Sequence, residues 1–315
     1  MSGKDSPALL TQEERVHWDS NGYLQIKSVL TDAEVMELRE AVDGLSSHFS
    51  RLPISERRRY LGLSGNQRDL MVKQAISFTP AIDRLLDHPG VFGRLLGLMG
   101  PYLQVVGTEA FVRYPHPGAL LRLHTDGGPG FRRFLPHADE PVLQLKVQFF
   151  LTDVAGPDSG NMVVVPGSHR RRFPDGGPDA AAGPRRQILA AAGDALVFPW
   201  SLWHAVAPNL SGQIRRSVII RYAQLWCRPQ DYARLDDETL SRMSPRRRLL
   251  LGVLPGNDGQ YDDLYRYYLP PSGEHVRVMY GAEWSDSVEA AEYAATEAAV
   301  RSGYSAKTRG GSGLR

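Results

Sequence analysis

The feature that most constrains the fold of this chain is a series of short apolar runs between residues 103 and 225. Each run is rich in β-branched or aromatic residues, and clusters of Gly, Pro, Asp or Asn separate it from the next. Short strands with such breaks are typical of sandwiches and barrels. We expect eight strands, within residues 103–114, 119–126, 142–153, 161–169, 186–191, 193–200, 202–207 and 215–225. Eight short strands predict a jelly roll or barrel.

Helices are expected before this β region. Thr11 and Thr31 can each cap a helix, and a short extended run lies between the two helices. Residues 80–100 indicate two short helices broken at Pro89. Residues 51–80 have weak periodicity and a basic cluster, which favours a solvent-exposed loop or helix face. The second capped helix is amphipathic, because its apolar positions recur at spacings of three and four: Val35, Leu38, Val42 and Leu45.

The expected organisation is one domain with appendages. Residues 1–102 form an N-terminal helical region that packs on the core, and residues 103–227 form the β core. Residues 228–284 form a C-terminal extension of helices and loops, in which one helix stops at Gly252. Residues 285–315 begin with an Ala-rich helix and have too little apolar content to pack, so we expect a flexible tail.

Composition narrows the choice of partner. The 37 basic and 35 acidic residues leave a net charge of +2, which gives no electrostatic reason to propose nucleic acid or a membrane surface as a partner. Cys227 is the single cysteine and the N-terminus is polar. No apolar run approaches the roughly 20 residues that span a bilayer. We expect a cytoplasmic monomer or homodimer that binds a small molecule.

Three residues have the chemistry of a metal site. His124 and Asp126 lie two apart on an extended segment, so both side chains point to one side. His204 begins a later strand and can supply a third ligand. Two imidazoles and one carboxylate on one face of an ion are the arrangement of non-haem iron(II) oxygenases. Alone, the first pair is a weak signal, because Asp126 before two glycines is also a good turn residue.

A cation on the last strand strengthens the metal interpretation. Strand alternation places Arg215, Ser217, Ile219 and Arg221 on one face and Arg216 on the other. A buried arginine needs an anionic partner, and the distal carboxylate of a 2-oxo acid can supply it, with the Ser217 hydroxyl as a further donor. The alternative is a solvent-facing strand with arginines on both faces.

These segments resemble the phytanoyl-CoA dioxygenase-like family of Fe(II)- and 2-oxoglutarate-dependent oxygenases. The resemblance runs from residue 22 through RRSVIIRY, about two thirds of the chain. Its most specific marks are HTD at 124–126, VVVPGSHR ending at Arg170, GDALVFPWSLWHAVAPN at 193–209, and Arg215.

The resemblance implies an α+β fold with a double-stranded β-helix core, jelly-roll or cupin-like, and helices from both ends of the chain packed around it. It implies iron held by His124, Asp126 and His204, with 2-oxoglutarate at Arg215 and dioxygen as the other co-substrate. Gln148 and Thr125 are lesser contacts for the oxo acid, although an outward polar strand face explains Gln148 equally well. His169 is expected to be structural. The implied activity is oxidation, by hydroxylation or a related outcome, of an unactivated C–H bond in a small molecule.

The loop at 127–140 follows the metal motif directly. Its glycines suit a hinge, and Phe131, Arg132, Arg133 and Phe134 are candidates for substrate contacts. The alternative is a solvated connection between two strands. Two other classes of function also fit the ligand set: a metal-dependent hydrolase on a cupin-like barrel, and a non-catalytic small-molecule-binding protein of the same fold.

Overall fold

A computed structural model describes residues 10–57, 69–118, 121–127, 134, 142–175, 177, 183–232, 234–253 and 278–281. Its strands form two antiparallel sheets, of order β1-β8-β5-β10-β3-β2 and β4-β9-β6-β7. Each of the eight predicted runs contains a strand, which confirms the jelly-roll core. The strands are β1 (Leu24–Ile26), β2 (Leu70–Lys73), β3 (Leu103–Arg113), β4 (Leu121–His124), β5 (Gln144–Phe150), β6 (Met162–Val164), β7 (Arg186–Gln187), β8 (Ala195–Pro199), β9 (His204–Val206) and β10 (Arg215–Gln224).

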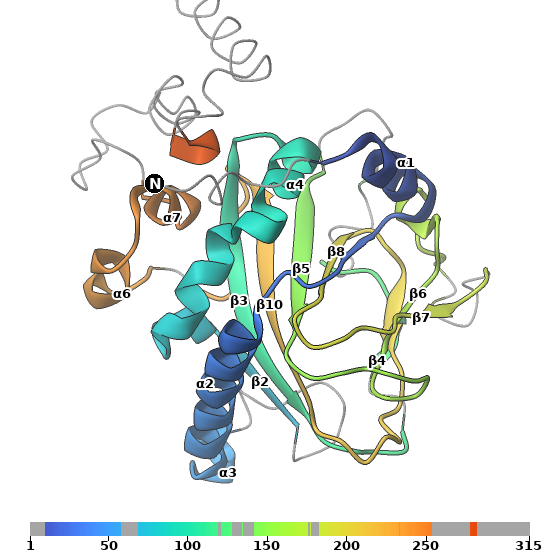
Figure 1. The fold of residues 1–315 in the computed structure, drawn as a ribbon, viewed down its shortest axis with the longest axis horizontal. Coiled ribbons are helices and arrows are strands. Elements are labelled where there is room, and N and C mark those ends of the chain that lie inside the picture. Colours follow the sequence, from blue (N-terminus) through green and yellow to red (C-terminus); the bar gives the residue numbers. More distant parts are fainter. Residues whose placement is uncertain are drawn as a thin grey trace, which may run out of the picture.

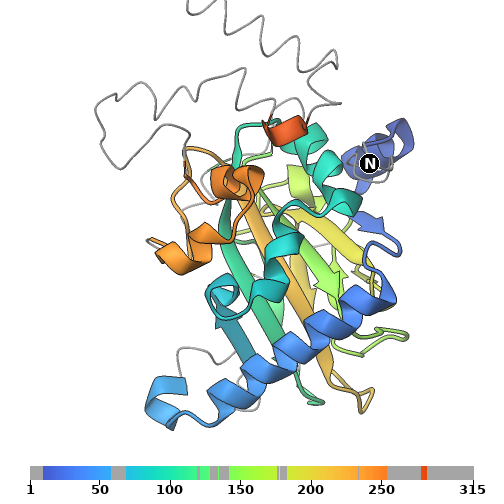
Figure 2. The ribbon, with the colours of Figure 1, turned by 60° about the vertical axis from the view of Figure 1, so that its left-hand side comes forward.

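Helices α2 (Asp32–Ser50) and α4 (Pro89–Met99) lie on the outer face of the six-stranded sheet, whereas α1 (Gln12–Asn21) contacts β1 at the sheet edge (Figure 1). The four-stranded sheet faces the inner side of the six-stranded sheet. Figure 2 shows α2 running along that outer face. The helical elements are α1 (Gln12–Asn21), α2 (Asp32–Ser50), α3 (Ile54–Arg57), η2 (Ala75–Ser77), η3 (Pro80–Asp87), α4 (Pro89–Met99), η4 (Ser168–Arg170), α6 (Asp237–Ser241) and α7 (Pro245–Leu250).

Local chemistry sets the helix ends. Thr11 and Thr31 each complete a capping box, in which the threonine and a glutamate three residues later bond each other's backbone N–H groups. Both predicted caps are therefore confirmed. The break at Pro89 separates η3 from α4, which ends at Gly100. The apolar stripe of α2 is buried as predicted.

Strand β5 shows how the sheet divides its side chains. Leu145, Val147 and Phe149 join the main hydrophobic core with the helices. The alternate residues Lys146 and Gln148 line a cavity between the two sheets, because successive strand residues point to opposite faces. The sheet therefore packs a core on one face and presents polar groups to the cavity on the other.

Strand β2 corrects one expectation. Residues 70–73 fall in the region predicted to be a solvent-exposed loop or helix face, yet they pair with β3 at the sheet edge. Leu70 and Val72 are both only 2% exposed. A four-residue run is too short to show a period, and the open edge of β3 decided its structure. Since β1 and β2 extend the major sheet, residues before 103 contribute strands as well as helices; the predicted domain boundaries stay a prediction.

Some expectations lie outside the described residues. These are the tail 285–315 with its Ala-rich helix, the end of the basic cluster at 58–59, and most of the loop at 127–140. Within the described part of the C-terminal extension, α7 is followed by Gly252 with a positive φ of 83°, as expected for a helix stop. None of the described helices has the length and apolar character needed to cross a membrane.

Candidate active site

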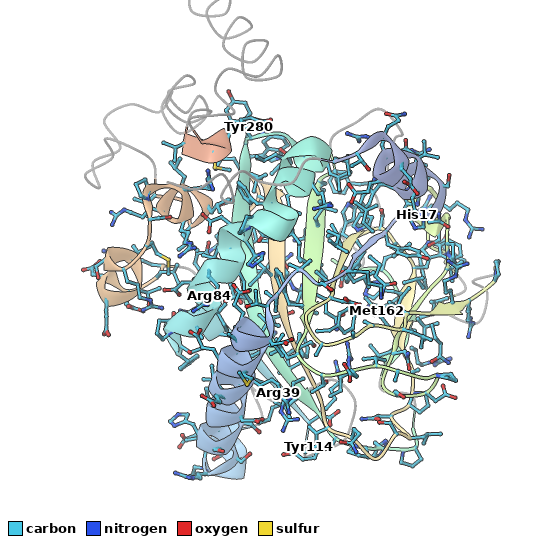
Figure 3. The ribbon with its side chains drawn as sticks, viewed as in Figure 1. His17, Arg39, Arg84, Tyr114, Met162 and Tyr280 are labelled. Carbon is cyan, nitrogen blue, oxygen red and sulfur yellow. The ribbon has the colours of Figure 1, made fainter. Side chains whose placement is uncertain are left out.

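The cavity between the sheets brings together most of the residues that the sequence singled out. His124, Asp126 and His204 reach it from the β4–β9 side. The six-stranded sheet contributes the opposite wall, including Gln148, Arg215 and Ser217. Met162, labelled in Figure 3, lines the cavity from β6.

The two histidines are oriented by the same local device. His124 and His204 are directly opposite partners on β4 and β9, and the centres of their rings lie 4.2 Å apart. The Nδ1–H of His124 donates to the carbonyl oxygen of Arg122 at 2.9 Å, and that of His204 donates to Leu202 at 2.8 Å. A hydrogen bond to a backbone carbonyl fixes the tautomer and leaves Nε2 with a lone pair, as in metal-ligating histidines.

Asp126 completes the set from the turn after β4. Its backbone N–H donates to the carbonyl oxygen of Trp200 at 3.0 Å, and Gly127 continues the turn with a φ of 75°. The carboxylate Oδ2 lies 3.8 Å from Nε2 of His204. One ligand atom from each of His124, Asp126 and His204 can be chosen such that all three lie within 4.8 Å of one another. The turn therefore brings the carboxylate to the paired imidazoles.

The protonation states favour a cation at this position. Burial lowers the pKa of His204 to about 3 and also lowers the pKa of His124. Burial alone would raise the pKa of Asp126, but the nearby ammonium of Lys146 lowers it overall. Neutral imidazoles and an ionised carboxylate are the forms that bind a metal ion. Two nitrogen ligands and one oxygen ligand fit a divalent transition metal such as iron(II).

Arg215 lies in the same cavity as a buried cation. It is 6% exposed, and its Nε has no hydrogen-bond partner among the described residues. Its guanidinium carbon lies 5.9 Å from the centre of the Phe150 ring. Burial, followed by the charge of Arg113, lowers the pKa of Arg215 to about 9. An unpaired charge at such a site is costly, so Arg215 is prepared for an anionic ligand.

The faces of β10 agree with the predicted alternation. Arg215, Ser217, Ile219 and Arg221 all line the cavity. Arg216 points to the other side, where its Nε lies 2.6 Å from Oδ1 of Asp43 on α2. The alternative, a solvent-facing strand with arginines on both faces, is wrong.

Comparison with known proteins identifies the family. A sequence profile described as Phytanoyl-CoA dioxygenase (PhyH) matches residues 18–217, well over half of the chain. The chain belongs to this family. Membership agrees with the resemblance carried by the HTD and PGSH segments.

Individual relatives of this PhyH chain are distant. An uncharacterised protein of Mycobacterium tuberculosis is 33% identical over 126 residues, which cover 39% of this chain and 44% of that protein. The chain thus aligns with less than half the length of this curated relative. Among solved structures, the α-ketoglutarate-dependent carbocyclase SnoK from nogalamycin biosynthesis is 26% identical, with a TM-score of 0.56 over 76% of this chain and 94% of SnoK. HygX from Streptomyces hygroscopicus, solved with nickel and 2-oxoglutarate, shares the fold at 19% identity, with a TM-score of 0.58 over 70% of this chain and 90% of HygX.

Thr125 and Gln148, the lesser candidates for contacts with the oxo acid in this PhyH chain, are also buried. Thr125 Oγ1 and Gln148 Nε2 have no hydrogen-bond partner among the described residues. Gln148 lines the cavity, so the interpretation of its strand face as outward and solvated is wrong. Gln148 therefore presents a polar group that a bound ligand can satisfy, whereas Thr125 is buried but is not among the residues that line the cavity.

Four charged residues of the cavity wall were not predicted as site residues: Glu109, Arg113, Lys146 and Arg221. Arg221 makes a bidentate contact with Glu109, with bonds of 2.9 to 3.0 Å. Lys146 contacts the candidate metal ligand Asp126 at 2.7 Å. The sequence signal was period-two alternation of polar residues on β3 and β5. That signal does not say whether the polar face meets solvent or a cavity.

The remaining candidates lie elsewhere. Phe131, Arg132 and Arg133 fall outside the described residues, and Phe134 is 59% exposed. His169 is buried in the PGSH turn, where its ring packs against Trp18 of α1. A Cβ at Gly22 would lie 2.3 Å from its Nδ1. His169 therefore packs the N-terminal segment onto the core, in agreement with a structural role.

Proposed function

We propose that this PhyH chain is an iron(II)- and 2-oxoglutarate-dependent oxygenase. In this proposal it hydroxylates, or otherwise oxidises, an unactivated C–H bond of a small molecule. His124, Asp126 and His204 hold the iron, and dioxygen is the second co-substrate. The family match supports the class of enzyme, and the grouping of the three ligand residues supports the metal.

The observation that carries the proposal is the position of Arg215. A buried guanidinium whose Nε lacks a partner lines the same cavity as the three metal-ligand candidates. A hydrolase that activates water on a metal needs no such cation. A co-substrate that binds the metal through one end and carries a carboxylate at the other end uses both the metal site and the Arg215 guanidinium. Arginine is suited to this role because its planar fork binds a carboxylate through two hydrogen bonds.

In this reaction the protein's own residues bind the metal and the co-substrate and orient them. Arg215 and Ser217 hold the distal carboxylate of 2-oxoglutarate, and Gln148 offers a further polar contact in the same cavity. When bound, iron(II) and 2-oxoglutarate supply the oxidising chemistry, in which dioxygen and 2-oxoglutarate yield succinate, carbon dioxide and one oxygen atom inserted into the C–H bond. The His204 and His124 tautomers stay fixed by their backbone hydrogen bonds.

The substrate is a small molecule in this proposal. Apolar side chains line the cavity beside the polar groups: Met71, Phe111, Met162, Phe198, Val206 and Ile219. Such a mixed lining suits an organic molecule with a few polar groups. SnoK is named as an enzyme of nogalamycin biosynthesis, which favours a role in tailoring a metabolite.

The test begins with protein loaded with iron(II) without oxygen. We expect 2-oxoglutarate to bind with a metal-to-ligand absorption band, and oxygen to give succinate that increases when a substrate from a small-molecule panel is present. The controls omit iron, 2-oxoglutarate or oxygen in turn. Failure of the iron-loaded protein to bind 2-oxoglutarate would overturn the proposal. Zinc-dependent hydrolysis without 2-oxoglutarate would instead support the hydrolase.

A further inference from the structure

Arg113 lies beside Arg215 in the wall of the cavity. The two residues are directly opposite partners on the antiparallel strands β3 and β10. Both line the cavity, and they are 8% and 6% exposed. Side chains at opposite positions on one face of such a pair have Cβ atoms about 4.5 to 5.5 Å apart. The sheet therefore holds two guanidinium groups next to each other in a buried place.

The charges of this pair are not balanced within the described residues. Arg113 forms an ion pair with Asp69, in which its Nη1 lies 3.7 Å from Oδ2 of the carboxylate. Tyr114, labelled in Figure 3, follows Arg113 at the end of β3, and its backbone N–H donates to Oδ1 of Asp69 at 2.8 Å. Asp69 thus accepts from the Tyr114 backbone and lies at the outer limit of an ion pair with Arg113. A second carboxylate near Arg113, that of Glu109, makes its short contacts to Arg221 instead.

A third arginine in the same cavity, Arg221, provides the contrast. Arg221 is compensated by Glu109 through two nitrogens, with contacts of 2.9 to 3.0 Å. Neither Arg113 nor Arg215 has such a partner in the described ranges. Two like charges in a medium of low dielectric constant repel each other strongly. An anion bound between them removes this repulsion.

The aromatic neighbours restrict where the two groups can go. The guanidinium carbon of Arg113 lies 5.2 Å from the centre of the Phe111 ring, and that of Arg215 lies 5.9 Å from the Phe150 ring. Contacts of this kind hold a cation over the ring face. Phe111 itself lines the cavity. The two arginines are thus preorganised before an anion arrives, which lowers the entropic cost of binding.

We propose that Arg113 is a second binding residue for the distal carboxylate of the 2-oxo acid co-substrate, which lies between Arg113 and Arg215. This rests on the function proposed above. Two guanidinium groups offer more N–H donors than one carboxylate requires, so each carboxylate oxygen can accept from a different arginine. The pair makes the site selective for 2-oxo acids with a distal carboxylate over those that end in a methyl group.

The test compares two ligands on one variant. Arg113→Gln and the wild type are loaded with nickel(II), and binding of 2-oxoglutarate and 2-oxopentanoate is measured by calorimetry. 2-Oxopentanoate has the same carbon chain but no distal carboxylate. We expect R113Q to weaken 2-oxoglutarate about ten- to a hundredfold, the usual effect of a hydrogen bond to a charged group. Binding of 2-oxopentanoate should stay within about threefold of the wild type.

Two further variants separate binding from folding. Arg216→Gln removes a guanidinium from the opposite face of β10, where it contacts Asp43, and should leave both affinities unchanged. Arg113→Lys keeps the charge near Asp69 and should bind 2-oxoglutarate with intermediate affinity, so it serves as the test if R113Q does not fold.

The outcomes are distinct. Equal weakening of both ligands would show that Arg113 only supports the structure, and unchanged 2-oxoglutarate binding would show that it serves another group, such as an acidic substrate. Either result overturns the proposed role of Arg113. The proposed function still stands in both cases if the wild type binds 2-oxoglutarate more tightly than 2-oxopentanoate. A wild type that binds neither acid would overturn the proposed function itself.

Discussion

The ammonium nitrogen of Lys146 lies 2.7 Å from both carboxylate oxygens of Asp126 in the cavity. It donates a hydrogen bond to Oδ1, and Oδ2 has the ion-pair distance without hydrogen-bond geometry. Both side chains are less than a tenth exposed. In the metal-free protein, Lys146 therefore supplies the positive charge that a buried carboxylate requires.

We expect Lys146→Met to lower the free energy of unfolding of the metal-free protein by about 3 kcal/mol, since it leaves Asp126 buried without its partner. A divalent metal replaces the missing charge, so metal should stabilise K146M more than the wild type. Denaturant unfolding with chelator and with nickel(II) measures both effects. Lys27→Met is the matched control, because exposed Lys27 pairs with Asp194 and should cost at most about 1 kcal/mol. A K146M protein as stable as the wild type in chelator would contradict the prediction.

Replacing His124, Asp126 or His204 by Ala should remove one metal ligand each. We expect each variant to lose bound iron and 2-oxoglutarate turnover, because two remaining ligands hold the ion weakly. Metal content after dialysis and succinate release measure these losses. His169→Leu removes a buried histidine outside the cavity group and should keep its iron. Full iron occupancy and product formation in D126A would show that the carboxylate assignment is wrong.

Arg215→Ala should weaken 2-oxoglutarate about ten- to a hundredfold, because a hydrogen bond to a charged group contributes roughly 1.5 to 3 kcal/mol. Arg216→Ala should change this affinity little, since its side chain points to α2 and contacts Asp43. Calorimetry on nickel-loaded protein compares the two variants. Similar losses of affinity in the two variants would show that Arg215 does not bind the co-substrate through the cavity face of β10 alone.

The carboxylate of Asp126 also limits the reaction outcome. A ligand position filled by a protein carboxylate is not vacant for chloride, so we expect oxygenation and no halogenation. Mass spectrometry of products formed in chloride buffer tests this. A chlorinated product from the unaltered protein would refute the expectation.

His169 predicts a pH dependence of stability that is separate from the metal site. Burial, followed by the charge of Arg170, lowers its pKa to about 4, below the ordinary value of about 6.5. Between these values the unfolded chain binds a proton that the folded chain does not, so the free energy of unfolding falls as the pH falls from 6.5 to 4. In chelator, His169→Leu should reduce this slope by up to about 1.4 kcal/mol per pH unit. An unchanged slope would show that His169 titrates normally in the folded protein.

The sequence by itself determined the features that depend on local chemistry. The strand runs, the caps at Thr11 and Thr31, and the opposite faces of Arg215 and Arg216 all follow from spacing within one short segment. The motif at His124 and Asp126 was also found from local spacing, although the turn after β4, and not strand alternation, places the Asp126 carboxylate in the structure.

Only the tertiary structure decided which segments meet. Residues 70–73 became a strand because β3 offered a free edge, and Arg113 came to face Arg215 because β3 and β10 pair in that register. On β5, alternating Gln144, Lys146 and Gln148 suit a solvent face or a cavity equally, and the covering sheet settled the choice. The physical reason is that strand pairing and burial join residues far apart in the chain, and a local sequence pattern does not specify which segment will pair with it or cover it.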